Sequence, residues 1–381
     1  MKRGLCLLLA LMLIVPVCAA AEGVDALEEQ IDQVLGTLDF SGLESLDIPG
    51  FDQEMRIESL VRVLASGQTV SPGDCVSRVI GAFFDALSEL GALMVSIMLP
   101  VLLSGIMLHT FASGRGLSGS LSRSVCTVII LIPVLLLVFS QLEHAKQTIT
   151  VMTDRMDKLL PMLLTLLTAL GGSASSAFLH PMVVAASGSM VFLAREVILR
   201  LVMCTCAVTA VNHLCDRAHL TRMAQLLRSG VCWLLGVSFT VFLGAMSLQG
   251  VCSASIDGVV LRAAKYAVDN FVPVVGGMFS DTMDTLVGCT LIVKNALGVA
   301  AVFVLLGAIL APLMRTLAVV FVIKLSAALL EPVAEAEIIR AIGDFSRTIV
   351  LFLITMLCVG TMYFLLIVQM LLVGNLTVML R

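Results

Sequence analysis

The chain has little charge and few aromatic side chains for its length. Of its 381 residues, 13% are Asp, Glu, Lys or Arg and 5% are aromatic, with one Trp and two Tyr. Soluble domains carry about 25% charged residues, so most of this chain is not built to face water. The clustered basic residues that mark nucleic-acid-binding proteins are also missing, and nucleic acid is not expected as a partner.

Catalytic and cofactor signatures are absent from the sequence as well. It contains no H-E-x-x-H, no G-x-x-x-x-G-K-[ST] and no C-x-x-C, which mark zinc proteases, phosphate-binding loops and thiol redox or zinc sites. The eleven cysteines are odd in number and mostly lie in apolar stretches, where a thiol packs as a small hydrophobe. We therefore expect no enzyme activity, no cofactor and no metal site.

What the chain does have is long apolar sequence. Hydrophobic residues make up 59% of it. Several apolar stretches approach or exceed the roughly 20 residues that a helix needs to cross the hydrocarbon core, and in lipid a helix satisfies its own backbone. We expect an all-α, polytopic membrane domain over residues 79–381 with about six to eight spans. The stretches cover residues 90–112, 124–142, 159–194, 196–214, 230–251, 286–311, 313–330 and 348–373.

Two segments are predicted to precede this membrane domain. Residues 1–21 have the layout of a signal peptide, with Lys2 and Arg3, a short apolar core and three alanines at 19–21. Cleavage after residue 21 is expected, and the alternative is an uncleaved anchor. Residues 22–78 hold twelve acidic and three basic side chains, with apolar positions at helical spacing. They predict a small acidic helical region outside the cytoplasm.

Two parts of the membrane domain depart from a simple spanning pattern. Around residues 159–194, a Gly/Ser-rich break separates two apolar runs, which predicts a helical hairpin or a re-entrant pair of half-helices. Over residues 255–271, apolar and polar positions occupy opposite faces of a helix, which predicts an amphipathic helix at the membrane surface. Between two further apolar runs, Glu196 and Arg200 are four residues apart and are expected to pair.

A turn and an acidic helix start follow the amphipathic segment. Pro273, Gly276 and Gly277 predict a hinge, because glycine allows backbone conformations that other residues avoid. The next helix is expected to begin at Ser280 or Asp281. Asp281 and Asp284 would then lie at the positive end of the helix dipole, which stabilises negative charge. The alternative is that they contribute to an ion site.

Two lysines interrupt apolar runs and are the most suggestive charges. Lys294, followed by Asn295, lies deep in one run, and Lys324 lies in another. A lysine within a span either faces a wet cavity or a partner acid, or extends its ammonium to the membrane surface. The candidate conduit or partner-contact residues are Lys294, Asn295, Lys324, Asp281 and Asp284.

Loop charges suggest an orientation, since Lys and Arg gather in cytoplasmic loops. Arg115, Arg217 and Arg315 favour the cytoplasmic side, and the acidic turn at residues 331–337 favours the opposite side. The C-terminus is then expected inside. Residues 213–219 contain two histidines, a cysteine and an aspartate, but their spacing matches no zinc site. They predict a basic cytoplasmic loop.

Residues 270–295, NFVPVVGGMFSDTMDTLVGCTLIVKN, resemble the stage III sporulation protein AE family. The segment AALLEPV at residues 327–333 is similar to the same family. The order of signal peptide, acidic head and multi-span body also agrees, so that the resemblance covers residues 22–381. It is most specific around residues 270–332.

The resemblance implies a non-enzymatic integral membrane component of a sporulation channel, in a secretion-like complex that links mother cell and forespore. Such a complex is needed for late forespore gene expression, and the implied location is the mother-cell membrane that engulfs the forespore. The implied partners are other membrane and ring-forming proteins of the same operon, including a secretion-type ATPase, with a homo-oligomer as a further option. The residues alone leave one alternative, a self-contained secondary transporter, which broken helices and intramembrane charge favour.

Overall fold

The computed structural model describes residues 117–169, 173–214, 220–271, 276–332, 334 and 336–379, together with short helical pieces between residues 81 and 103. The predicted signal peptide and acidic head lie outside the described residues, as does Pro273 of the predicted hinge. The elements are α6 (Leu117–Ala169), α7 (Ser173–Phe192), the π-helix η2 (Leu193–Ile198), α8 (Leu199–Leu214), α9 (Thr221–Phe271), α10 (Gly276–Leu330) and α11 (Ala336–Met379).

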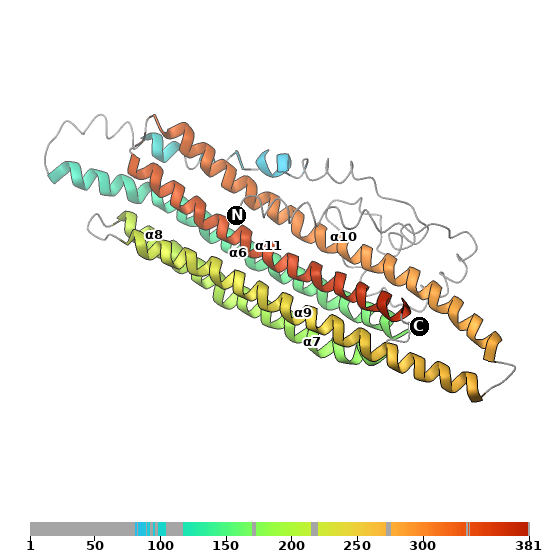
Figure 1. Ribbon diagram of the computed structural model, residues 1–381. Coiled ribbons are helices and arrows are strands. Elements are labelled where there is room, and N and C mark those ends of the chain that lie inside the picture. The colour runs from blue at the N-terminus through green and yellow to red at the C-terminus, as the bar shows by residue number, and fades with distance from the viewer. Residues whose placement is uncertain are drawn as a thin grey trace.

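Long helices lie side by side along one axis and alternate in direction (Figure 1). Helices α6, α9 and α11 run one way. Helix α10 runs the other way, as does the uninterrupted helical run formed by α7, η2 and α8. The prediction of an all-helical protein is confirmed for the described part of the chain.

Helices α10 and α11 form an antiparallel hairpin that is buried along most of its length. Near the turn, Leu330 and Ile338 are both buried. Further along, Gly360 lies against Ile309, and Gly298 lies against Leu371. Helix α6 packs on both members of this hairpin, and α9 and α8 pack on α11. Apolar side chains from all these helices make one continuous core.

Four helical segments in the described part are long and apolar enough to cross a membrane. They are Thr127–Thr168, Thr221–Leu248, Thr290–Leu330 and Ala336–Leu372. The chain is therefore a multi-pass membrane protein. Because α6 and α9 run in the same direction, the helical run from α7 to α8 between them must return through the same thickness. If α6 and α9 both span, this run is a further crossing.

The apolar stretches at residues 286–311 and 313–330, which Pro312 separates in the sequence, belong to one helix, α10. Proline is tolerated inside membrane helices when neighbours and local adjustments satisfy the freed backbone groups. Merging two predicted spans removes one crossing. His213 at the end of α8 contacts Asp344 near the start of α11, so the acidic turn lies at the same end as the α8–α9 connection, and the prediction that these two connections lie on opposite sides is wrong.

The C-terminal end of α11 lies at the opposite end of the bundle (Figure 1). Beside it lies the α6–α7 corner, while the end of α9 and the start of α10 extend beyond it. At that corner, Thr168 Oγ1 donates a hydrogen bond to Ser176 Oγ at 2.9 Å. Residues 159–169 are the last turns of α6, so the apolar run there continues the long helix. Whether any part of residues 159–194 is re-entrant stays a prediction.

Helix α9 continues through Phe271, so the predicted amphipathic segment 255–271 is the end of a 51-residue helix. Its place at the membrane surface stays a prediction. Helix α10 begins at Gly276, and the predicted start at Ser280 or Asp281 is wrong. Gly276 and Gly277 begin the helix, because glycine is well tolerated at the first positions, where the backbone N–H groups have no partner within the helix.

Candidate functional site

Lys294 is buried between α10 and α11. Its side chain is 1% exposed, and Nζ donates a hydrogen bond to the backbone oxygen of Leu371 at 2.8 Å. The ammonium therefore contacts protein and does not reach the outside of the bundle. Gly298, one turn along α10, faces the side chain of Leu371, so the absence of a side chain at residue 298 allows α11 to come close to Lys294.

Replacing Lys294 with Met should leave the free energy of unfolding unchanged or raise it by about 1 kcal/mol. The reason is that a buried ammonium loses its hydration, while Met fills a similar volume without that cost. Thermal unfolding of the purified protein in detergent measures the effect. A clear loss of stability would show that the hydrogen bond to Leu371 is structurally required. Unchanged stability with defective sporulation would assign Lys294 to function.

The other predicted site residues are not brought together with Lys294. Asn295 is half-buried beside it in the chain, and Lys324 is exposed on α10. Thirty positions separate the two lysines, which is about 45 Å along a helix. Asp281 and Asp284 lie within α10, five and eight residues after its first residue, Gly276. They do not cap the helix, and the predicted site residues are distributed along α10.

Exposed polar side chains gather instead on α6, where sequence reasoning predicted no site. Between Thr127 and Phe139, the exposed large residues of this helix are apolar: Val128, Ile129, Ile132, Leu136 and Phe139. From residue 140 to 168, every exposed position except Pro161 is polar. We call these residues the α6 polar stripe: Ser140, Glu143, Gln147, Asp154, Asp157, Lys158, Thr165 and Thr168. Their mostly three- and four-residue spacing places them on one face of the helix.

Two contacts fix the level of this stripe in the bundle. Arg155 Nη1 donates to the backbone oxygen of Val304 on α10 at 3.1 Å. Tyr363 on α11 donates its hydroxyl hydrogen to Thr153 Oγ1 at 3.1 Å. Val304 lies at the middle of residues 295–314, a run of 20 residues without a charged side chain. Such a run is about 30 Å long, the thickness of the hydrocarbon core.

The neighbouring helices are charge-free at the same level. Tyr363 lies within residues 348–380 of the chain, which hold no charged side chain. Gln369 Nε2 donates to the backbone oxygen of Met246 at 2.6 Å, which aligns α11 with residues 229–256 of α9, also charge-free. The α6 polar stripe thus lies at the depth where α9, α10 and α11 are most suited to lipid.

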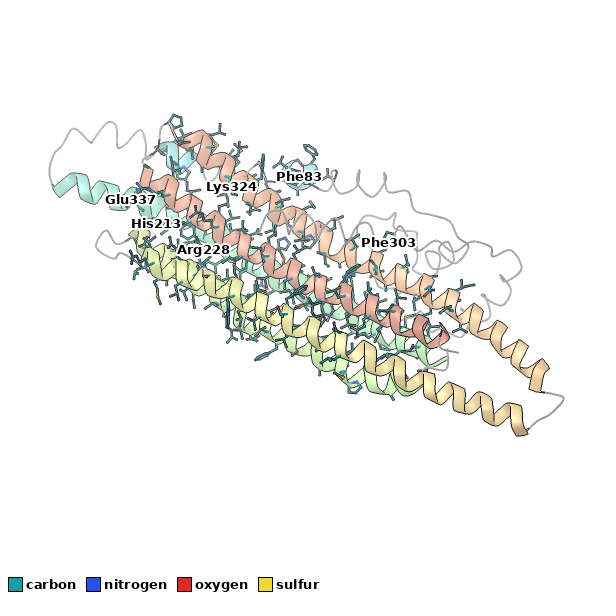
Figure 2. The ribbon with its side chains drawn as sticks, in the orientation of Figure 1. Phe83, His213, Arg228, Phe303, Lys324 and Glu337 are labelled. Atoms are coloured by element: carbon teal, nitrogen blue, oxygen red, sulfur yellow. The ribbon has the colours of Figure 1, made fainter. Side chains whose placement is uncertain are left out.

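A second group of charges lies at the end of the bundle where α11 begins, and we call it the Asp344 cluster (Figure 2). The carboxylate of Asp344 on α11 lies 3.3 Å from His213 Nε2 on α8 and 3.8 Å from Arg228 Nη1 on α9. It accepts a hydrogen bond from Arg347 Nη1 at 3.2 Å, and its backbone oxygen accepts one from Arg228 Nη2 at 3.3 Å.

The Asp344 cluster joins three helices through one carboxylate. The side chains of His213 and Arg228 are only 9% and 18% exposed, so little water is available to replace Asp344 as their partner. Sequence reasoning missed the cluster, because Asp344 lies 131 residues from His213. One feature of the sequence could have drawn attention to Asp344, which is that it is the last acidic residue in the sequence.

The model of the stage III sporulation protein AE family matches residues 55–374. This chain belongs to that family. It is 28% identical over 333 residues to the stage III sporulation protein AE of Bacillus subtilis (strain 168), with 87% of this chain and 84% of that protein covered. No solved structure matches the chain. The resemblance at residues 270–295 and 327–333 is thereby confirmed, and the chain is a membrane protein involved in sporulation.

The family match includes the α6 polar stripe, Lys294 and the Asp344 cluster. It also includes the predicted pair of Glu196 and Arg200, which is confirmed as a hydrogen-bonded ion pair. This pair lies where η2 meets α8, on an exposed part of the helical run. The comparisons indicate no catalytic activity for this member of the stage III sporulation protein AE family.

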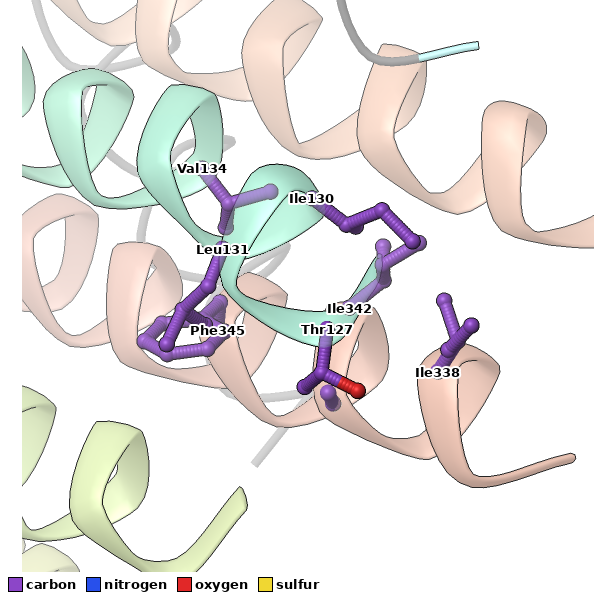
Figure 3. A pocket seen from close by; sticks show the side chains of 8 residues that line it. Thr127, Ile130, Leu131, Val134, Ile338, Ile342 and Phe345 are labelled. Atoms are coloured by element: carbon purple, nitrogen blue, oxygen red, sulfur yellow. The ribbon is translucent and has the colours of Figure 1, made fainter. Parts of the chain in front are cut away.

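A small pocket of this sporulation protein lies between α6 and α11 (Figure 3). Apart from Thr127, its lining is entirely apolar: Ile130, Leu131, Val134, Ile338, Ala341, Ile342 and Phe345. It offers no charged group to a polar ligand and lies away from the α6 polar stripe. We interpret it as a packing gap of the hydrophobic core.

Proposed function

We propose that this chain is a non-enzymatic membrane component of the channel assembly that joins mother cell and forespore, in the mother-cell membrane that engulfs the forespore. Family membership supplies the sporulation context. The observation that carries the channel role is the α6 polar stripe, which brings charged side chains to the depth of charge-free segments on α9, α10 and α11.

A polar face at this depth is costly in lipid. A charged side chain at the centre of a spanning helix costs roughly 2.5–3.5 kcal/mol on insertion scales. Three carboxylates and one ammonium lie on the exposed face of α6, so that face requires water or polar protein beside it. Such a surface suits a protein that forms a conduit together with other subunits.

The proposed partners are other membrane and ring-forming proteins of the same operon, together with a secretion-type ATPase. The sequence contains no phosphate-binding loop of its own, so any ATP-driven step must be supplied by another chain. The alternative, a self-contained transporter, differs in a measurable way. It would move its solute when reconstituted alone, whereas a channel component requires its partners.

The experiment is complementation in the native sporulating host. Deleting the gene should abolish late forespore gene expression, and the wild-type gene should restore it. A variant carrying Asp154→Leu and Asp157→Leu should accumulate in the membrane but restore expression poorly, because the stripe loses two of its three exposed acids. The matched Asp→Asn pair keeps the polarity and should restore expression better. Normal late forespore expression in the deletion strain would refute the proposal.

A further inference from the structure

We propose that the α6 polar stripe is the wall of a water-filled path that prefers cations. This inference rests on the proposed function and deepens it, since it names the residues that face the path and the class of solute that they favour. Three media can cover a face at membrane depth: lipid, protein or water. The composition of the stripe distinguishes among them.

Lipid and protein both fit the stripe poorly. Charged side chains are costly in hydrocarbon, and Glu143, Asp154 and Asp157 are all exposed. The fully buried parts of protein interfaces are about 65% apolar, with large apolar anchors. Between residues 140 and 168 of α6, no large apolar side chain is exposed. Water suits hydroxyl, amide and carboxylate groups, which make up nearly the whole face.

The opposite character appears on α9. At the level of the charge-free segments, its exposed large side chains are apolar, with Trp233 69% exposed, Val241 65% and Leu248 72%. One helix of the bundle is thus suited to lipid and another to water at the same depth. A bundle of this kind fits a position in the wall of an assembly, with lipid outside and the path inside.

The signs of the exposed charges favour cations. The stripe exposes three carboxylates and one ammonium, that of Lys158, while the other basic side chains of this segment, Lys146 and Arg155, are partly buried. Arg155 directs its guanidinium to the backbone oxygen of Val304. Acidic side chains along a pore raise the local concentration of cations and exclude anions.

Cysteine accessibility in membranes of sporulating cells tests the inference on the full chain. Gln147→Cys represents the stripe, with Thr165→Cys as a second position if the first variant fails to accumulate. Val241→Cys and Leu248→Cys are the controls on α9. The two controls lie at depths between those of Gln147 and Thr165, because Tyr363 contacts Thr153 while Gln369 contacts Met246, and α6, α9 and α11 run in the same direction.

The probes are two charged thiol reagents of similar size, the trimethylammonium-ethyl and sulfonato-ethyl methanethiosulfonates. Each labelling rate is normalised to that of free cysteine and read at the engineered site by peptide mass spectrometry. Both reagents should label the stripe position, with the cationic reagent faster by about tenfold. The α9 positions should stay unlabelled. Adding Asp154→Asn and Asp157→Asn should remove most of the preference while labelling persists.

Three results would overturn the inference. Unlabelled stripe cysteines would show that protein or lipid covers α6. Equal labelling of α6 and α9 would place this level outside the membrane. A cation preference that survives both Asn substitutions would show that these acids do not set it. Labelling is measured without reference to spore formation, so it can fail while complementation still supports the channel role, and the reverse also holds.

Discussion

Replacing Asp344 with Ala should lower the free energy of unfolding by about 2–3 kcal/mol. This carboxylate is the shared partner of His213, Arg228 and Arg347, which come from three helices. Without it, the half-buried guanidinium of Arg228 keeps its charge and loses its counter-ion, and only the hydrogen bond to the backbone oxygen of residue 344 remains. Arg228 Nε already lacks a hydrogen-bond partner in the described structure, so little compensation is available locally. Thermal unfolding in detergent, followed by circular dichroism, measures the loss.

The matched control is Arg347→Ala. The Arg347 side chain is 68% exposed, and exposed ion pairs contribute at most about 1 kcal/mol. This variant should therefore unfold almost as the wild type does. Asp344→Asn should lie between the two, because an amide oxygen still accepts hydrogen bonds but carries no charge. If Asp344→Ala proved as mild as Arg347→Ala, the cluster would not hold the three helices together.

Replacing Gly298 with Leu should reduce stability by about 3 kcal/mol or prevent accumulation of the protein. A Cβ atom at residue 298 would lie 2.1 Å from Leu371 Cδ2 and 2.7 Å from Leu371 Cγ. These atoms belong to the end of the Leu371 side chain, so a leucine at residue 298 forces that side chain to shift, and α11 with it where the side chain alone cannot give way. A shift of α11 would also move the backbone oxygen of Leu371 away from Lys294 Nζ. Membrane accumulation and thermal unfolding are the measurements.

Glycines on α9 supply the control. Nothing lies within 4 Å of a Cβ atom placed at Gly236 or Gly244, and Leu at either position should change stability by less than about 0.5 kcal/mol. Combining Gly298→Ala with Leu371→Ala should recover much of the stability, since the second change removes the atoms that clash. Equal behaviour of Gly298→Leu and Gly244→Leu would contradict the close approach of α10 and α11.

The helical membrane architecture follows from apolar runs, and the sequence reveals it readily. The joins between runs are harder to predict. Pro312 suggested a break, yet α10 passes through it, because packed neighbours compensate for a lost backbone hydrogen bond. Residues 143–158 looked like a gap between two apolar stretches. They form part of α6, since they contain neither proline nor glycine and many good helix formers.

The side-chain contacts of the candidate site were also hard to predict from the sequence. Lys294 attracted notice because a lysine in an apolar run is rare, and the structure buries it. Its acceptor is a backbone oxygen 77 residues away, and a backbone oxygen has no sequence signature. The polar residues of the α6 polar stripe can be read from the sequence. Their significance depends on which parts of the other helices lie at the same depth, and this follows only from the tertiary structure.

Apart from the hydrogen bond from Arg155 to Val304, the long-range polar contacts described above converge on α11. Helix α11 supplies the backbone oxygen for Lys294, the carboxylate for His213 and Arg228, and the side chains of Tyr363 and Gln369 that reach α6 and α9. This helix leaves the ribosome after every helix that it contacts. During biosynthesis these groups on the earlier helices therefore stay unpaired until α11 joins the bundle. A chain truncated before α11 would lack the partners of Lys294, His213 and Arg228.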